Sequence, residues 1–365
     1  MGILAVVNQK GGVGKTTVAL GLASAWMVRG RRVLVVDMDP QANATTGLGV
    51  FDAGVTIDDV LAQDVPGAAR SAVRPSGWEP PVGDAPDLVP SAPRLAQREH
   101  QLATDPIGAQ DRLAVAIRGV GDEYDEVIID CPPSLGLLTV NALFAADRVL
   151  IVAEPAAWSL DGVEQILRNV ARISERRDGR PALAGIVVNR LGRTRDAAYW
   201  YGQLQETHGD LLLDPPIGAR AAVTEAAAQS MPIHLLRREG GPEAGEQFGA
   251  LVRSLERIDL SAPRDAGSPE VEQATPIGAT PSDDPVSSDG AVSSDAAVLS
   301  DAAVLSDAAV LSDATVSSDA TVSSDAAPPQ NGSSSDPATG PHETGRIDLS
   351  HAVTSSVSTV AGAEL

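Results

Sequence analysis

The sequence predicts an α/β fold in which helices cover both faces of a twisted, mostly parallel sheet, followed by a disordered acidic tail. Solid apolar runs that end in aspartate, at 32–37 and 126–130, are typical of parallel strands buried on both faces. Helix-like segments such as the amphipathic stretch 158–176 alternate with these runs. The composition changes near residue 260, so we expect a folded domain over 1–260 and a tail over 261–365.

The first apolar run, 3–7, leads into a glycine-rich stretch, N-Q-K-G-G-V-G-K-T-T, over residues 8–17. A segment with few helix breakers follows from 18 to 29, so the order is strand, turn and helix start. Backbone N–H groups in such a turn face phosphate oxygens at the positive end of the helix. We therefore predict a phosphate-binding loop, in which Lys15 reaches the β and γ phosphates and Thr16 supplies a hydroxyl ligand to Mg²⁺. Its nucleotide contacts are Gly11, Gly12, Val13, Gly14, Lys15, Thr16 and Thr17.

The loop departs from the general motif G-x-x-x-x-G-K-[ST], because Gln9 stands where that motif has its first glycine, and Lys10 follows it. The text K-G-G-x-G-K-T resembles the deviant Walker A loop of the ParA/MinD class of P-loop ATPases. The resemblance implies a P-loop NTPase fold, ATP and Mg²⁺ as cofactors, and a homodimer in the ATP state. It also implies that Lys10 crosses the dimer interface and contacts the partner's ATP. Lys10 and Lys15 are the only lysines among 27 basic residues, and an arginine fork cannot replace a compact ammonium between phosphates.

Two aspartates, Asp37 and Asp39, follow the second apolar run at the end of a strand, where open α/β sheets place their ligands. A pair of solvated turn aspartates is the alternative interpretation. The text D-x-D-P-Q-x-N resembles the second signature of the ParA family, which implies that Asp39 orients or activates the attacking water. Asp39 is also counted among the metal-binding residues, and Asp37 is expected to support the Mg²⁺ shell and the loop.

The region from 56 to 121 contains several prolines that limit long helices. A short strand over 87–90 and helices over 94–102 and 109–118 are expected there. No catalytic or binding residue is assigned to this region. Two short sequences in this region, T-I-D-D-V-L and D-L-V-P, also resemble ParA proteins. We therefore expect the region to lie at the periphery of the sheet.

The apolar run 126–130 ends at Asp130 and has the Walker B pattern, in which the aspartate binds Mg²⁺ through a water molecule. Taken alone this pattern is weak, since many buried strands end in aspartate. The text D-C-P-P-S-L-G-L-L-T-V-N-A-L, which begins there, resembles the ParA family and strengthens the assignment. Cys131 is the only cysteine, which excludes an internal disulfide and fits a reducing compartment. We expect it to be a buried packing residue.

The second half of the domain continues the alternation of strands and helices. We expect strands at 149–152 and 185–190, a short strand before the prolines 215–216, and helices near 158–176, 197–208, 219–229 and 242–258. The resemblance places an adenine contact at Asn189, and Pro216 is included among the nucleotide-binding residues. The five histidines are scattered and form no metal-ligand spacing.

The resemblance covers about residues 1–258 and implies a DNA partition ATPase. In such a protein the ATP-bound dimer binds DNA without sequence preference, and a ParB-type centromere-binding protein stimulates slow, Mg²⁺-dependent hydrolysis. This implies a cytoplasmic, nucleoid-associated protein. Since the chain carries a formal net charge of −22, DNA binding requires a local basic patch. The candidates, each equally consistent with a solvated or ion-paired surface residue, are Arg193, Arg195, Arg220 and Arg253.

A membrane-cycling, MinD-like positioning ATPase is the alternative, since it shares every nucleotide motif. It requires a basic amphipathic helix at the C-terminus to bind lipid, and residues 351–365 contain no lysine or arginine. An electron-transferring ATPase would require paired cysteines to hold a cluster, and this chain has one cysteine. We therefore expect no membrane partner.

The tail over 261–365 contains 16 acidic and 2 basic residues. Six-residue repeats of the type S-D-A-A-V-L occupy about 288–327. In a helix this period spreads equivalent residues over three faces, and in a strand it leaves neither face apolar. We therefore predict disorder. Two roles are open for the tail, an electrostatic spacer that lowers non-specific affinity for DNA and a neutral expansion of the repeat.

Overall fold

The computed structural model describes residues 2–80, 83–157 and 159–258, and its centre is a seven-stranded sheet. The strand order is β3-β4-β2-β5-β1-β6-β7, and all neighbours are parallel except β3 and β4. The prediction of a mostly parallel sheet is therefore confirmed. The strands are β1 (Gly2–Val7), β2 (Val33–Asp37), β3 (Arg74–Pro75), β4 (Asp87–Val89), β5 (Glu126–Asp130), β6 (Arg148–Ala153) and β7 (Ala182–Val188).

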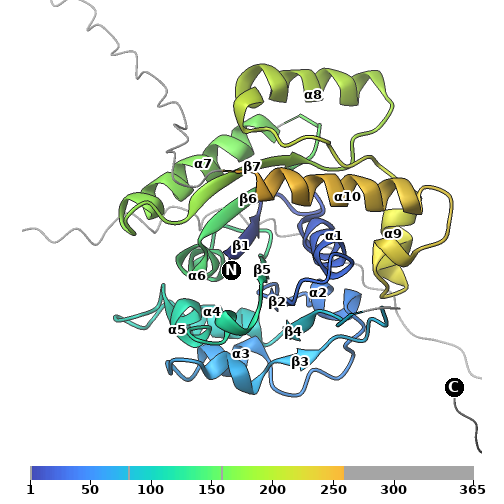
Figure 1. Ribbon diagram of the computed structural model, residues 1–365. Helices are drawn as coiled ribbons and strands as arrows, with labels where there is room; N and C mark the ends of the chain where they lie inside the picture. Colours follow the sequence, from blue (N-terminus) through green and yellow to red (C-terminus); the bar gives the residue numbers. More distant parts are fainter. Residues whose placement is uncertain (1, 81–82, 158, 259–365) are drawn as a thin grey trace, which may run out of the picture. The chain divides into compact units, whose positions relative to one another are not determined.

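Helices lie on both faces of this sheet (Figure 1). One face is covered by α1 (Lys15–Met27), α2 (Asn43–Gly47), α9 (Ala221–Ala228), α10 (Gly241–Glu256) and the 3₁₀ turn η4 (Ile233–Leu235). The other face is covered by α3 (Ile57–Leu61), α4 (Leu95–Leu102), α5 (Arg112–Ala116), α6 (Leu137–Ala145), α7 (Ser159–Glu175) and the turns η1 (Ala68–Ser71) and η2 (Gly121–Glu123). Helix α8 (Arg195–His208) and the turn η3 (Gly209–Leu211) contribute Leu204 and Leu211 to this second core.

Alternate residues of each strand supply the two hydrophobic cores. On β1, Leu4 and Val6 belong to the core under α1 and α10, whereas Ala5 and Val7 belong to the core under α6 and α7. Because both faces are covered, these strands have no polar side. This explains the unbroken apolar runs in the sequence.

The carboxyl ends of β1, β2 and β5 lie side by side in register. Val6 of β1 and Asp37 of β2 are both partners of Asp130 at the end of β5. From β1 the chain crosses to β2, toward the β3 edge of the sheet, whereas from β5 it crosses over β1 to β6, toward the β7 edge. The direction of winding therefore reverses around β1. Such a reversal opens a crevice at the carboxyl edge, where ligands of α/β sheets bind.

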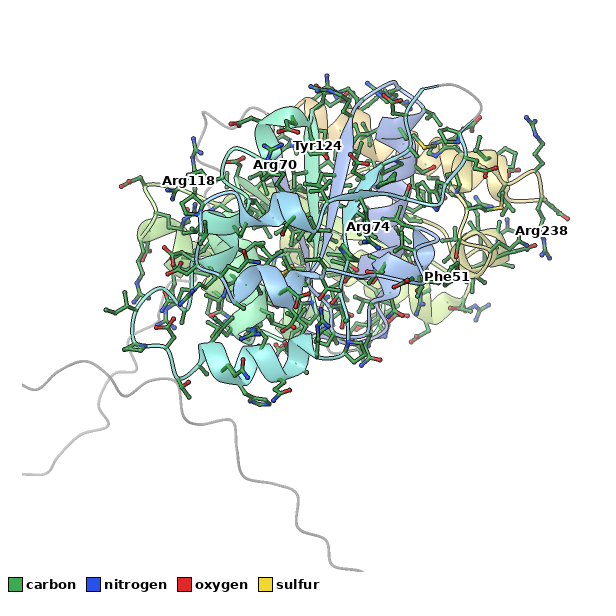
Figure 2. The ribbon with its side chains drawn as sticks, turned by 90° about the horizontal axis from the view of Figure 1, so that it is seen from below. Phe51, Arg70, Arg74, Arg118, Tyr124 and Arg238 are labelled. Atoms are coloured by element: carbon green, nitrogen blue, oxygen red, sulfur yellow. The ribbon has the colours of Figure 1, made fainter. Side chains whose placement is uncertain are left out.

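The segment between β2 and β5 extends one edge of the sheet, in agreement with the peripheral position predicted for it. The Tyr124 hydroxyl donates to Asp87 of β4 at 2.7 Å, and burial raises the pKa of this tyrosine. Arg74 of β3 donates to the carbonyl of Asp52, next to Phe51, whose residue surface is 80% exposed (Figure 2). These contacts attach the edge strands to the preceding loop and to the start of β5.

The short strand predicted before Pro216 does not form. Leu212 makes only an isolated bridge to Ile186 of β7. Leu213 and Ile217 donate to carbonyls of β7, but the two prolines between them have no N–H with which to continue the ladder. The segment therefore follows β7 without becoming an eighth strand.

Several helices differ from the prediction, among them the five-residue helices α2 and α3, which were not predicted. The helix predicted over 109–118 is confined to Arg112–Ala116. Helix α6 was not predicted because its sequence, LLTVNALFA, is apolar on nearly every side and shows no amphipathic stripe. It is buried between β1, α5 and α7, which accounts for this composition.

The described residues all belong to one compact unit. The tail predicted over 261–365 and its repeats lie outside the described residues. Within the described part of the chain, no helix has the length and apolar character needed to cross a membrane.

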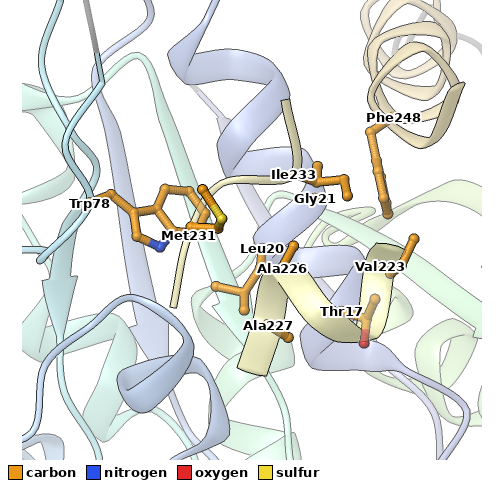
Figure 3. A pocket seen from close by; sticks show the side chains of 10 residues that line it. All are labelled: Thr17, Leu20, Gly21, Trp78, Val223, Ala226, Ala227, Met231, Ile233 and Phe248. Atoms are coloured by element: carbon orange, nitrogen blue, oxygen red, sulfur yellow. The ribbon is translucent and has the colours of Figure 1, made fainter. Parts of the chain in front are cut away.

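Gly21 of α1 packs against the ring of Phe248 of α10, beside a cavity of about 20 Å³ (Figure 3). A Cβ atom at Gly21 would lie 2.3 Å from this fully buried ring. The cavity has room for about one water molecule and cannot take a displaced ring. Gly21→Ala is therefore expected to lower the free energy of unfolding by about 1–3 kcal/mol, although alanine is the better helix former.

Urea unfolding followed by circular dichroism measures this effect. The matched control is Gly202→Ala in α8, where an added Cβ would meet no neighbouring atom within 4 Å. This control is expected to raise the free energy of unfolding by up to about 1 kcal/mol. If both variants change stability in the same direction, the close packing of Gly21 on Phe248 is wrong.

Candidate nucleotide site

The phosphate loop lies in the turn between β1 and α1. Its backbone is left-handed at Gly12, with φ 82°, and at Gly14, with φ 88°. Gly14 is the N-cap of α1, and no side chain caps the first turn of this helix. The first N–H groups of α1 therefore keep their capacity to bind an anion. Gly11 and Gly12 are exposed, whereas Val13 is buried.

Asn189 follows β7 and lies directly against this loop. Its side chain is buried, and its Nδ2 donates to the Val13 carbonyl at 2.8 Å. A Cβ atom at Gly14 would lie 2.2 Å from that Nδ2, so glycine is required there for space as well as for its φ. In this arrangement the Asn189 amide holds the loop, and its contact with adenine stays a prediction. The predicted contact Pro216 is half-buried, and its carbonyl accepts from Gln247 Nε2 at 3.1 Å.

Lys15 is buried at the start of α1, and its Nζ makes a long hydrogen bond of 3.4 Å to the carbonyl of Lys10. Burial lowers the pKa of Lys15, and the carboxyl groups of Asp130 and Asp39 act in the opposite sense. The ammonium and the two carboxyl groups thus form one electrostatic cluster. A buried ammonium with a long hydrogen bond favours an anionic ligand that can reach it.

Thr16 and Asp130 lie in contact beneath the loop. The Thr16 hydroxyl donates to Asp130 Oδ2 at 2.7 Å, while the buried Oδ1 of Asp130 has no hydrogen-bond partner. Burial raises the pKa of Asp130 well above its usual range, and the neighbouring Asp37 adds to this effect. A carboxylate oxygen without a partner beside a hydroxyl fits a Mg²⁺ site.

Among the described residues, Thr16 and Asp130 are not surrounded by a complete set of protein ligands for a metal ion. In the part of the chain that the structure describes, no group of three or more His, Cys, Asp or Glu side chains could hold a metal ion. Mg²⁺ does not require such a set, since it is usually held by one or two side chains together with phosphates and waters. The donor set of Thr16 and Asp130 is therefore suited to Mg²⁺ that arrives with a nucleotide.

Asp37 is fully buried and holds the loop that follows β2. It accepts from the N–H and the hydroxyl of Thr45, at 2.8 and 2.7 Å, and from the N–H of Asp39 at 3.1 Å. Burial raises the pKa of Asp37 to about 6. Thr45 in turn accepts from the N–H of Ser91 at 2.9 Å. Asp39 is also buried and accepts from the N–H of Gln41 at 2.9 Å, so neither aspartate is a solvated turn residue.

Lys10 differs from Lys15 in its surroundings. Its side chain is 48% exposed, and its Nζ lies 3.8 Å from Glu154 Oε2 just after β6. Asn8 fixes its backbone, because the Asn8 Oδ1 accepts from the N–H of Lys10 at 2.7 Å. The main chain of Lys10 is therefore anchored at the loop, while its ammonium lies at the surface.

Three of the four candidate DNA-binding arginines lie on joined segments. Arg193 and Arg195 are exposed at the beginning of α8, and Arg220 is half-buried just before α9. A parallel bridge between Leu191 and Gly218 joins the two segments. The arginines thus follow the same carboxyl edge of the sheet that holds the phosphate loop.

Arg253 lies apart from these three. It is exposed in the last turn of α10, close to Glu256, which pairs with Arg29 at 2.7 Å. Arg29 follows the end of α1, and α1 runs from the carboxyl edge of the sheet to its amino edge. Arg253 therefore lies toward the amino edge of the sheet, at the opposite end of the fold from the phosphate loop.

Three residues of this region were missed by the sequence reasoning, namely Asn8, Thr45 and Gln247. Asn8 directly precedes the loop motif, so its position was a usable signal. Thr45 and Gln247 carry no such signal, because only the fold brings them to Asp37 and Pro216.

Known proteins share this combination of fold and loop. A family model described as AAA domain matches residues 1–183. The sporulation initiation inhibitor protein Soj of Bacillus subtilis is 35% identical over 236 residues, which cover 64% of this chain and 90% of Soj. This chain belongs to the ParA/MinD class of P-loop ATPases. Another member, the chromosome partitioning protein ParA of Caulobacter vibrioides, is 34% identical over 262 residues, covering 70% of this chain and 95% of that one.

Solved structures agree with this membership. A structure described as cobyrinic acid a,c-diamide synthase from Mycobacterium smegmatis, with a bound ATP analogue and magnesium, is 30% identical with a TM-score of 0.57. The match covers 70% of this chain and 96% of the chain in that structure. The cell division ATPase MinD from Pyrococcus furiosus is 28% identical with a TM-score of 0.56, covering 71% of this chain and 100% of its own. The predicted P-loop fold and the predicted family of this ParA-type ATPase are thereby confirmed.

Proposed function

We propose that this chain is an ATP-dependent DNA partition ATPase over residues 1–260, with 261–365 as an acidic tail. The observation that carries the proposal is the position of Lys10. Its ammonium is half exposed, whereas the buried Lys15 already serves the loop. An extra lysine at the surface beside a phosphate loop is suited to contact the nucleotide of a second subunit. The proposed working unit is therefore a homodimer with ATP between its subunits.

The proposed reaction is transfer of the γ-phosphoryl group of ATP to water. Lys15 and the N–H groups of residues 11–17 hold the phosphates, and Thr16 and Asp130 hold Mg²⁺. Mg²⁺, when bound, neutralises charge on the phosphate oxygens. Asp39 orients the attacking water, since its carboxyl group lies near Lys15 and is fixed by the turn to Gln41. Slow hydrolysis that depends on a ParB-type adaptor follows from the similarity to partition proteins.

The DNA surface is proposed to include Arg193, Arg195 and Arg220. Their two segments are joined at the edge of the sheet that carries the phosphate loop. Nucleotide-dependent pairing of two subunits would bring two such surfaces together and raise the affinity for DNA. The proposal implies that the protein is located in the cytoplasm and associates with the nucleoid.

Changing Arg193, Arg195 and Arg220 together to glutamate is expected to lower ATP-dependent retention on non-specific DNA at least tenfold. Dimer formation with ATP is expected to stay unchanged, as measured by light scattering. The matched control changes the exposed Arg168 and Arg172 of α7 and Arg176 just after it, which carry the same charge on another face. Equal losses in the two triple variants would mean that net charge alone, and not this surface, controls binding to DNA.

The membrane-cycling alternative is tested with the same protein. Co-sedimentation with DNA and with anionic liposomes, each in ATP and in ADP, compares the two ligands directly. Partition predicts ATP-dependent retention on DNA and none on liposomes. Retention on liposomes alone would contradict the proposed function.

A further inference from the structure

Gln247 of α10 contacts both ends of the short segment 216–220. Its Nε2 donates to the Pro216 carbonyl at 3.1 Å. Its Oε1 accepts from the N–H of Gly218 at 3.3 Å and from Nε of Arg220 at 3.5 Å. One neutral side chain thus binds three residues of a segment that has no ladder of its own.

The same segment is also connected to the phosphate loop. Leu191 donates to Ile217 and accepts from Ala219, at 3.0 Å in both cases. Leu191 comes two residues after Asn189, whose amide donates to Val13. The phosphate loop is therefore connected to the segment that Gln247 holds by the Asn189 hydrogen bond, the main chain from 189 to 191, and the hydrogen bonds of Leu191.

The two ends of the segment are expected to contact different ligands, the nucleotide at one end and DNA at the other. Pro216 is the predicted nucleotide contact, and Arg220 is the proposed DNA contact. Main-chain hydrogen bonds to Val188 and Leu191 hold residues 217–219, but they do not orient the Arg220 side chain. Gln247 adds a side-chain constraint from α10, whose core residues Phe248 and Leu251 are fully buried and hold the helix rigidly.

We propose that Gln247 is a positioning residue that fixes Arg220 for DNA binding in the nucleotide-bound dimer. This inference rests on the proposed function. Gln247 does not contact DNA; it orients the Arg220 guanidinium through Nε and fixes the main chain two residues before it. The two terminal guanidinium nitrogens of Arg220 remain as donors for a phosphate oxygen.

The test is Gln247→Met, which keeps the length of the side chain and removes its hydrogen bonds. The full chain is assayed with a non-hydrolysable ATP analogue and a random-sequence duplex at several salt concentrations. We expect the affinity for DNA to fall several-fold and the dependence of log K on log salt to lose about one unit of slope, as for loss of one phosphate contact. The control is Gln229→Met at the end of α9, where the amide contacts only the neighbouring turn through Glu225. It is expected to leave both quantities unchanged.

A double-mutant cycle with Arg220→Ala separates positioning from general damage. If Gln247 acts through Arg220, Gln247→Met has little further effect on DNA affinity in the Arg220→Ala background. Additive losses, or an unchanged salt slope in Gln247→Met, would overturn the inference while the proposed function stands. If the unmodified chain with the ATP analogue is not retained on DNA, the proposed function fails, and this inference fails with it.

Discussion

Lys15→Ala is expected to weaken the binding of ATP about 100-fold or more. Its ammonium is buried at the start of α1 among Asp39 and Asp130, so its loss leaves these acidic groups without the cation that faces the phosphates. Removing one partner of a buried charge pair costs about 2–5 kcal/mol, and each 1.4 kcal/mol is tenfold in affinity. Titration calorimetry with a non-hydrolysable ATP analogue and Mg²⁺ measures the change.

Lys15→Arg serves as the comparison, because it keeps the charge and changes its shape. The planar guanidinium is too wide for a position beneath the loop, so this variant is also expected to lose binding. Circular dichroism shows whether both variants fold. Near-normal ATP affinity in folded Lys15→Ala would mean that the nucleotide binds elsewhere.

Lys10→Ala is expected to leave ATP affinity within about threefold and to abolish the ATP-dependent dimer. In the single subunit its ammonium is half exposed and meets only the rim carboxylate of Glu154, a contact that contributes at most about 1 kcal/mol. Its proposed partner is the nucleotide of the second subunit. Analytical ultracentrifugation with ATP measures the dimer, and phosphate release with an adaptor measures stimulated hydrolysis.

The control is Glu154→Gln, which removes the partner of Lys10 within its own subunit and leaves the lysine in place. This variant is expected to form the dimer as the unmodified chain does. Normal hydrolysis by Lys10→Ala as a monomer would refute the two-subunit interpretation of the loop. Loss of the dimer in both variants would show that the surface pair, rather than a contact across the interface, is what matters.

The parts of the fold that could be predicted are those governed by local rules. Strand β5 has the predicted bounds, Glu126–Asp130, because an apolar run that ends in aspartate is a buried strand in this setting. The approach of Asp37 to Asp130 was also accessible, since parallel strands end at the same edge of the sheet. These elements required only periodicity, composition and the handed geometry of the sheet.

The parts that could not be predicted depend on contacts distant in the sequence. The Thr45 hydroxyl donates a hydrogen bond to Asp37 only because α2 folds back over the end of β2. The position of Asn189 was predicted correctly at the end of a strand, but its hydrogen bond to Val13 requires β7 to lie beside β6 and the loop. Neither contact leaves a trace in local composition.

The register of β2 and β5 sets two buried carboxyl groups next to each other, Asp37 and Asp130. Burial raises the pKa of both, and repulsion adds to it, from Asp37 at Asp130 and from Asp39 at Asp37, so the buried carboxyl groups lower the stability of the unliganded fold. Replacing such a pair with apolar residues would relieve the repulsion and remove the site. The buried carboxyl pair therefore lowers the stability of the unliganded fold, and a cation bound beside it would restore part of that stability.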